Sequence, residues 1–396
     1  MAKEQNERGK QTILDFIRKS GRVARIDIAN ECNISQATVT TITAKFLAAG
    51  LIEEIARDPE EGESRRGRPR VDLKLRGEAH IVAGVKVANS SISVVLSDFE
   101  GKPLCKSRKN LKESVSTTRK LARKIGKSIE ALCFENGYRL SDLSAVGVGI
   151  AGFVDADSGF VHWSPSLEQR NIDFGEVLRA RLGIPVFLDN DANLAAMAER
   201  YFWHGVDVPN FLVVTIESGV GIGIVMDGRV YRGARGFGAE FGHTKVQLEG
   251  ALCRCGQRGC LEAYISDYAL VQEASVAGTL IAGDTQEQQV LSLFTAAQEM
   301  EPIAQSIVSK ARRMFAMGLA NLVNIFDPQL IILIGNQMQE GLIYSDDMIN
   351  SVKSSIVRID NTAPQFVVHP TGDALWARGA AVFALEMIAT QSLKEI

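Results

Sequence analysis

The segment from Gly238 to Tyr264 reads GAEFGHTKVQLEGALCRCGQRGCLEAY and holds the densest group of metal-binding side chains in the sequence. Three of the six cysteines fall within eight residues in a C-x-C-x4-C pattern, and a histidine lies ten positions upstream of the first. Three thiolates and one imidazole form the closed tetrahedral set typical of structural Zn²⁺, whereas a loop with merely buried or paired cysteines is the alternative. The four expected zinc ligands are His243, Cys253, Cys255 and Cys260.

The pattern G-x-E-x-G-H followed by C-x-C-G-x-x-G-C-L-E resembles the signature of the ROK family, which contains sugar kinases and sugar-responsive transcriptional repressors. The resemblance runs from about Gly84 to the C-terminus. It implies that the His and the three Cys bind zinc, and that Glu240, His243 and Glu262 hold hydroxyl groups of a hexose. It also implies an α/β domain of the actin-like (ribonuclease H-like) class with two lobes.

Composition describes an ordinary globular protein of more than one domain. The chain has 396 residues, 46% of them hydrophobic, and a net charge of -3. The sequence has no run of about 18 apolar residues and no apolar stretch near its start, so we expect no membrane span, no signal peptide and a cytoplasmic location. Cys32, Cys105 and Cys133 stand singly in apolar surroundings and are expected to be free thiols.

The N-terminal region is the most basic part of the chain. Residues 1–76 contain 15 Lys and Arg against 12 Asp and Glu, a net charge of +3, and the remainder carries -6. Apolar spacing predicts short helices at Gly9–Ser20, Arg25–Cys32 and Ser35–Ala49, and Leu51–Leu75 looks like a β wing. We therefore expect a winged helix-turn-helix at residues 1–80, with a generic helical bundle as the alternative.

The third helix has a face of small hydrogen-bonding residues and contains no arginine, which favours A·T-rich half-sites. Beyond it, the basic run Arg65–Arg70 suits an A·T-rich minor groove, and a solvated linker is the competing interpretation. The expected DNA-contacting residues are Ser35, Gln36, Ala37, Thr38, Thr40, Thr41, Thr43, Lys45, Arg66, Arg68 and Arg70.

After residue 80, apolar strands alternate with helices, and a second copy of an opening strand pair begins at Asn210. The duplication fits the two-lobed fold that the resemblance implies. We expect a first lobe at residues 81–192 and a second lobe with the zinc site at residues 193–374. The last helix, residues 375–396, is expected to pack back on the first lobe.

Asn190 and Asp191 follow a buried strand directly, where α/β sheets collect ligand-binding groups. Both residue types are also preferred helix caps, which is the plainer interpretation of the residues alone. The resemblance assigns Asp191 to the general base of the kinases and Asn190 to a sugar ligand. A sugar bound by these residues and by the glutamates of the second lobe would bridge the two lobes.

The phosphate-binding half of a kinase site is altered in this sequence. The related kinases carry an acidic residue and Gly-Gly-Thr after the first strand, whereas Lys86, Ala88 and Asn89 stand here. The glycines between Glu217 and Gly223 remain, but such turns also simply connect strands. The changed residues after the first strand predict that the protein is not an active kinase.

The three tryptophans are expected to be packing residues rather than surfaces on which a sugar ring stacks.

Together these features predict a ROK-type transcriptional repressor that binds a double-stranded DNA operator and responds to a monosaccharide or its derivative. A homodimer or homotetramer is expected, with one structural Zn²⁺ per chain and no membrane partner. Two alternatives stay open: a sugar kinase fused to a DNA-binding domain, and a repressor controlled by a partner protein.

Overall fold

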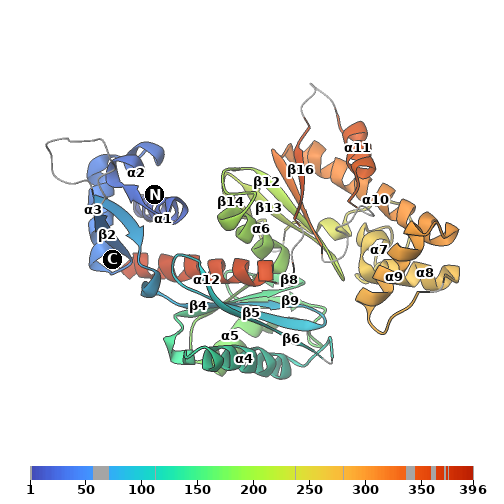
Figure 1. The fold of residues 1–396 in the computed structure, drawn as a ribbon, viewed down its shortest axis with the longest axis horizontal. Helices are drawn as coiled ribbons and strands as arrows, with labels where there is room; N and C mark the ends of the chain where they lie inside the picture. Colours follow the sequence, from blue (N-terminus) through green and yellow to red (C-terminus); the bar gives the residue numbers. More distant parts are fainter. Residues whose placement is uncertain are drawn as a thin grey trace.

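The structure, a computed structural model, describes residues 2–56, 71–111, 113–236, 238–279, 281–335, 344–357, 363–369, 372 and 374–395. An N-terminal unit is followed by two lobes, and the last helix runs back from the second lobe to the N-terminal unit (Figure 1). The basic run Arg65–Arg70, including Arg66, Arg68 and Arg70, lies outside the described residues.

Three helices and a small antiparallel sheet build the N-terminal unit. The helices are α1 (Ala2–Ser20), α2 (Arg25–Glu31) and α3 (Gln36–Ala48), and the strands in sheet order are β1 (Val23–Ala24), β3 (Val71–Leu75) and β2 (Ile52–Ala56). Helix α3 begins where the Ser35 hydroxyl accepts a hydrogen bond from the Thr38 amide, at 3.2 Å. It buries Val39, Ile42 and Phe46 at the helical spacing expected from the sequence.

Each lobe contains a five-stranded sheet, and the two sheets follow the same plan. The order is β11-β7-β4-β5-β6 in the first lobe and β16-β15-β12-β13-β14 in the second. In both sheets, three consecutive strands form an antiparallel meander. A fourth strand pairs in parallel with the first strand of the meander, and a fifth strand pairs in parallel with the fourth. The strands of the first lobe are β4 (Val82–Val87), β5 (Ser91–Ser97), β6 (Pro103–Asn110), β7 (Ala145–Ile150) and β11 (Val186–Asn190). Those of the second are β12 (Phe211–Ile216), β13 (Val220–Met226), β14 (Arg229–Tyr231), β15 (Leu330–Ile334) and β16 (Gln365–His369).

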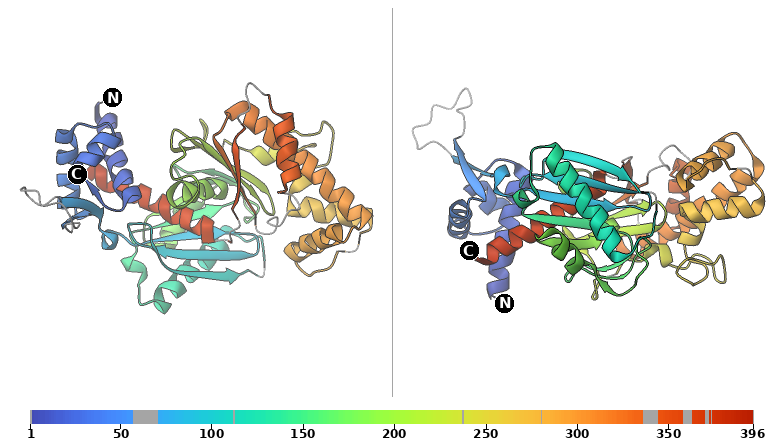
Figure 2. Two further views of the ribbon diagram at one scale, coloured as in Figure 1. Left: turned by 45° about the horizontal axis from the view of Figure 1, so that its top comes forward. Right: turned by 90° about the horizontal axis from the view of Figure 1, so that it is seen from below.

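The helix that follows the last strand of each lobe crosses to the other lobe. Helix α6 (Asp191–Phe202) leaves β11 and packs on β12 and β13, whereas α12 (Ala374–Glu395) leaves β16 and packs on β4, β5 and β7. The two helices also pack on each other between the sheets (Figure 2). This exchange makes α6 and α12 the structural connection between the lobes.

Glycines allow α12 to approach its neighbours at backbone distance. A Cβ atom at Gly84 would lie 1.9 Å from the Ala377 carbonyl oxygen, and one at Gly379 would lie 1.8 Å from that of Leu194. No side chain fits at either position, because real Cβ contacts are far longer. The sheet of the first lobe, α12 and α6 are therefore stacked without space between their backbones.

The far end of α12 completes the core of the N-terminal unit. Ile13, Leu14 and Ile17 of α1 share one buried apolar cluster with Leu385 and Ile388 of α12. The two helices also lie side by side in both views of Figure 2. The N-terminal unit thus shares its hydrophobic core with the chain's last helix.

The remaining elements cover the outer faces. The first lobe adds α4 (Thr118–Glu135), α5 (Phe174–Leu182) and a small sheet of β8 (Phe153–Asp155), β9 (Phe160–Trp163) and β10 (Ile172–Asp173). The second adds α7 (Glu262–Ile265), α8 (Asp267–Ala277), α9 (Gln286–Gln298), α10 (Pro302–Phe326) and α11 (Asp346–Ser355). The small sheet was not expected from the sequence, because strands of two to four residues are too short to show a period.

Candidate functional site

The cysteine-rich segment folds into a tight turn that brings its sulfurs together. The Cys253 amide donates to the Gln257 carbonyl (2.8 Å), and the Gly256 amide donates to the Cys253 carbonyl (2.9 Å). Gly259 has a φ of +76°, and a Cβ there would lie 1.7 Å from the Gln247 carbonyl oxygen. The glycines between the cysteines are thus required by the backbone of the turn.

The four expected zinc ligands lie together. One potential ligand atom from each lies within 4.8 Å of all the others. The sulfurs of Cys255 and Cys260 are 3.7 Å apart, as are the Cys253 sulfur and Nδ1 of His243. Zn–S bonds of about 2.3 Å in a tetrahedron separate two sulfurs by about 3.8 Å, so the donor set fits Zn²⁺. A bound ion would hold the turn together and take no part in chemistry, because four protein ligands leave it no open position.

Burial explains why this cluster favours a cation. Desolvation raises the pKa of the Cys253 thiol to about 12. Burial is also the largest single influence on the pKa of the exposed Cys255 and raises it, but several hydrogen bonds and the Lys245 charge together outweigh burial and lower this pKa. The Lys245 ammonium also lies 2.9 Å from the Cys260 sulfur. A thiolate at Cys253 therefore depends on a nearby positive charge, which a metal ion supplies.

A cavity of about 560 Å³ lies between the lobes and is lined by all five expected sugar-binding residues: Asn190, Asp191, Glu240, His243 and Glu262. Its size suits a small molecule. Nδ1 of His243 points toward the cysteines, and its Nε2 lies 3.9 Å from a carboxylate oxygen of Glu240. The imidazole therefore connects the cysteine cluster to the cavity.

Two glutamates in the cavity repel each other. Burial, followed by the charges of Glu262 and Asp191, raises the pKa of Glu240 to about 8. Glu262 is held by the Val220 amide at 3.3 Å and the Tyr268 hydroxyl at 3.4 Å. Glu262 is thus fixed at the cavity wall, where it can accept hydrogen bonds from a polyhydroxylated ligand.

Asn190 caps α6, as the plainer sequence interpretation allows. Its side-chain oxygen accepts from the Ala192 amide at 2.8 Å, and its NH₂ group donates to the Gly152 carbonyl at 2.9 Å. The residue still lines the cavity. A ligand that hydrogen-bonds to this amide group must therefore either share it with these two contacts or replace one of them.

Lys86 lies at the centre of the other half of the cavity, and the sequence did not indicate its partners. Its ammonium is 2.7 Å from Asp191 and 3.3 Å from Glu217, and it lies 4.5 Å from the ring centre of Trp376. The side chain is 1% exposed. Because Glu217 directly follows β12 of the second lobe and Lys86 belongs to β4 of the first, this buried cation joins the two lobes.

The glycines after Glu217 have packing roles. A Cβ at Gly221 would lie 2.9 Å from the Ala192 side chain, and one at Gly223 would lie 2.4 Å from the Ala192 carbonyl oxygen. Close approach of α6 to β13 therefore accounts for both residues without a bound phosphate. A Cβ at Gly219 would lie 3.2 Å from a Glu262 oxygen at the cavity wall.

One aromatic residue differs from its expected role. Trp163 lines the cavity beside Phe153, with ring centres 5.6 Å apart, so it is not only a packing residue. Trp376 is fully buried, as expected. The sequence interpretation missed Trp163 because the small sheet that carries it was not anticipated.

Helix α3 and its N-terminal cap expose most of the residues that the sequence predicts to contact DNA. The exposed residues are Ser35, Gln36, Ala37, Thr38, Thr40 and Thr41, and Lys45 is half-buried. Thr43 is the exception: it is fully buried, and its hydroxyl accepts from Arg25 at 3.1 Å, so the expectation that it contacts bases is wrong. Thr43 lies on the face of α3 that packs on the rest of the unit.

The model of the ROK family matches residues 82–387, more than half of the chain. The chain belongs to the ROK family. Similar proteins include a xylose repressor from Caldicellulosiruptor bescii, 28% identical over 335 residues (83% of this chain, 82% of that one). Another is the DNA-binding transcriptional dual regulator NagC of Escherichia coli K12, 28% identical over 325 residues (81% and 78%).

Two solved structures place the fold. A ROK family transcriptional regulator, a homologue of the E. coli Mlc protein, has a TM-score of 0.77 at 24% identity and covers 97% of both chains. A ROK family glucokinase from Streptomyces griseus, solved with glucose and AMPPNP, has a TM-score of 0.65 at 29% identity, covering 77% of this chain and 99% of its own. The predicted fold class is confirmed.

Among the described residues, no helix combines the length and apolar character needed to cross a membrane.

Proposed function

We propose that this chain is a sugar-responsive transcriptional repressor whose N-terminal unit binds operator DNA and whose ROK domain senses a monosaccharide or a derivative. Relatives named as a xylose repressor and as NagC match over about four fifths of the chain, which supports this assignment. The polar exposed face of α3 supplies hydrogen-bonding groups for base edges, and Arg66, Arg68 and Arg70 are proposed to contact the minor groove.

The observation that carries the proposal is the ion pair between Lys86 and Asp191. Phosphoryl transfer requires a base near the attacking hydroxyl and cations around the phosphates. Here Asp191, the residue that would be the base, accepts from Lys86 through one oxygen and from the Ala192 amide (3.0 Å) through the other. The carboxylate is thus already paired with a buried cation and held by the backbone, so the cavity favours binding over phosphoryl transfer.

The opposite half of the cavity supports sugar binding. We assign the hydroxyl-binding role to Glu240, His243 and Glu262, with Asn190 and Asp191 on the first lobe. We further propose that His243, Cys253, Cys255 and Cys260 hold a structural Zn²⁺ ion that fixes the position of the His243 ring. A homodimer would place two α3 helices on half-sites about 10 bp or a multiple apart.

The test is a titration of labelled A·T-rich palindromic DNA by fluorescence anisotropy, at several salt concentrations, with D-xylose, D-glucose or N-acetylglucosamine. We expect specific binding that weakens with salt and is released by a sugar that also raises thermal stability. The same preparations with Mg-ATP should give no sugar phosphate. Steady turnover abolished by Asp191→Ala, without operator binding, would instead identify a kinase.

A further inference from the structure

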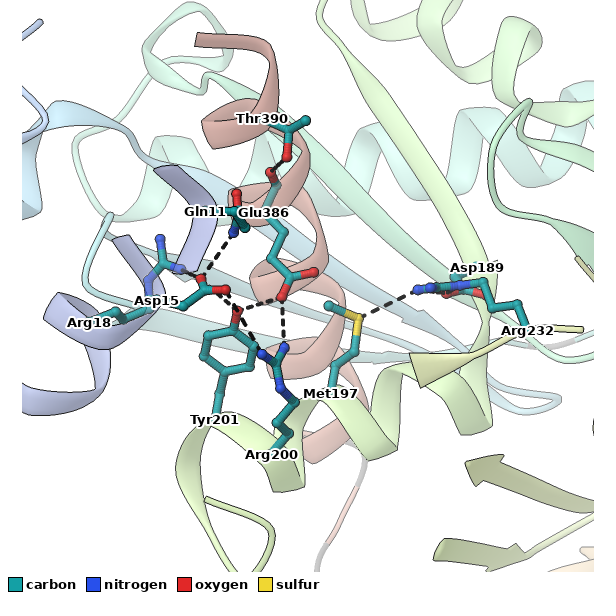
Figure 3. Close-up of polar contacts among 10 residues, drawn as sticks. All are labelled: Gln11, Asp15, Arg18, Asp189, Met197, Arg200, Tyr201, Arg232, Glu386 and Thr390. Atoms are coloured by element: carbon teal, nitrogen blue, oxygen red, sulfur yellow. Dashed lines mark hydrogen bonds and ion pairs between the residues drawn. The ribbon is translucent and has the colours of Figure 1, made fainter. Parts of the chain in front are cut away.

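A partly buried polar cluster joins α1 to the helices that connect the lobes (Figure 3). This cluster, the α1 joint, consists of Asp15 and Arg18 of α1, Arg200 and Tyr201 of α6, and Glu386 of α12. The Tyr201 hydroxyl lies 3.2 Å from Asp15 and also contacts Glu386, while Arg200 bonds Glu386 at 3.1 Å and lies 3.9 Å from Asp15. Each of the three helices thus contributes a charged group.

The environment of the α1 joint both favours and opposes ionisation of Asp15, and it leaves part of Arg18 without a hydrogen-bond partner among the described residues. Burial, and then the nearby Glu386 carboxylate, raises the pKa of Asp15, although Arg18 and Arg200 lower it. Arg18 lies between the rings of Phe99 and Tyr201, and its Nε and one Nη atom are buried without a hydrogen-bond partner among the described residues. A cavity of about 1070 Å³ runs beside the cluster. Incompletely satisfied buried networks depend strongly on geometry, so a small displacement changes their energy.

The same two helices reach the sugar cavity at their other ends. Asp191, the first residue of α6, pairs with Lys86, and Trp376 near the start of α12 covers the same ammonium. Tyr201 and Glu386 each lie ten residues further along their helices, about 15 Å at the α-helical rise. Both helices therefore extend from the contacts of the Lys86 ammonium, here called the Lys86 centre, to the α1 joint.

Neither helix can bend or slide freely between its ends. A Cβ at Gly379 of α12 would lie 1.8 Å from the Leu194 carbonyl of α6, and one at Gly223 of β13 would lie 2.4 Å from the Ala192 carbonyl. Interiors packed this closely transmit a displacement instead of absorbing it. A change at the Lys86 centre therefore moves α6 and α12 as stiff bodies.

We propose that α6 and α12 transmit the state of the sugar cavity to the DNA-binding unit through the α1 joint. Arg200, Tyr201 and Glu386 act as positioning residues that set the orientation of α1. This inference rests on the proposed function, because it describes how sugar binding would change operator affinity. A ligand that shifts Asp191 or Lys86 favours one arrangement of the joint, and that differential affinity is the coupling between the sites.

The main experiment compares operator Kd with and without D-xylose, D-glucose or N-acetylglucosamine in the full chain. Tyr201→Phe removes the hydroxyl that contacts Asp15 and Glu386, and Asp15→Asn removes the negative charge that faces Arg18 and Arg200; both keep the side-chain shape. Arg181→Gln is the matched control, because it breaks an Arg181–Glu130 pair of 2.8 Å in the first lobe away from α1. If wild type changes operator affinity on the order of 10-fold with sugar, both joint variants should fall below about 2-fold at unchanged sugar Kd, and the control should not.

A second arm needs no effector. Hydrogen exchange of the α1 amides is compared between wild type and Asp191→Asn, and again in a Tyr201→Phe background. We expect Asp191→Asn to change α1 exchange several-fold only when Tyr201 is present. An unchanged sugar response in both joint variants, or α1 exchange that ignores Asp191→Asn, would overturn the inference. Failure of wild type to bind operator would contradict the proposed function, while the exchange experiment would still decide the inference.

Discussion

The two halves of the cavity between the lobes are built differently. The half formed by Glu240, His243 and Glu262 keeps acidic groups and a histidine fixed from behind by the cysteine cluster. In the half around Lys86, one buried ammonium occupies the carboxylates of Asp191 and Glu217. Under the proposed function, the first half would recognise the sugar, and the second half would hold a structural ion pair where a kinase holds reactive groups.

The largest test of this comparison is removal of the cysteine cluster. We expect Cys260→Ser to release the metal and to destabilise the second lobe on the order of 5 kcal/mol, because metal binding to such sites contributes directly to folding. Elemental analysis and thermal unfolding measure both effects. Cys105→Ser, a half-buried thiol outside the cluster, is the control. A variant without zinc that unfolds like wild type would contradict the structural role.

Removal of Lys86 tests the other half. Lys86→Met leaves two carboxylates without their cation and should destabilise the protein by about 3 kcal/mol, because breaking a buried ion pair on one side exposes the full desolvation cost. Lys310→Met breaks a pair with Glu273 at 2.8 Å that is about one third exposed, and it should cost less than about 1 kcal/mol. Urea unfolding compares the two. Equal effects would mean that the buried Lys86 ion pair contributes no more to stability than an exposed one.

The carboxyl group of Asp267 should make the free energy of unfolding depend on pH. Burial, and then the charges of Glu217 and Glu287, raises the pKa of Asp267 from 3.8 to about 7. The folded state therefore keeps a proton that the unfolded state releases, so this contribution is complete below pH 3.8 and is lost as the pH rises through about 7. Asp267→Asn should remove a few kcal/mol of this decline. Urea unfolding between about pH 4 and about pH 8 measures it, and an equally steep decline in the variant would refute the assignment.

The smallest expected effect concerns the half of the cavity formed by Glu240, His243 and Glu262. Glu262→Gln keeps the shape of the side chain but removes its charge, so the affinity for a stabilising sugar should fall roughly 10- to 100-fold, the range for a hydrogen bond to a charged group. Isothermal titration with the sugar that raises thermal stability gives this ratio. Glu249→Gln, an exposed position of the same segment, should bind like wild type. Equal affinities would remove Glu262 from the pocket.

These cases also show what the sequence could predict. The four cysteine-cluster residues lie within 18 positions, so their spacing alone indicated that they gather, and the structure brings them together. The helices of the N-terminal unit followed from apolar periodicity, although Thr43 was placed on the wrong face. Lys86 could be recognised as unusual, but its partners lie 105 and 131 residues away, and no local pattern indicates such pairs. The packing of α12 on the first lobe was expected from the family resemblance, but the packing of α6 on the second lobe was not predicted, because no local pattern in the sequence indicates it.

The position of α12 has a consequence for synthesis. Ala374 follows the end of β4 by about 290 residues, which corresponds to roughly 15–60 s of translation at about 5–20 residues per second. Throughout that interval the glycine-lined face of the first sheet and the apolar side of α1 lack the helix that covers both. The N-terminal unit and the first sheet thus leave the ribosome first but finish packing last. The N-terminal unit acquires its full hydrophobic core only after both lobes have been made.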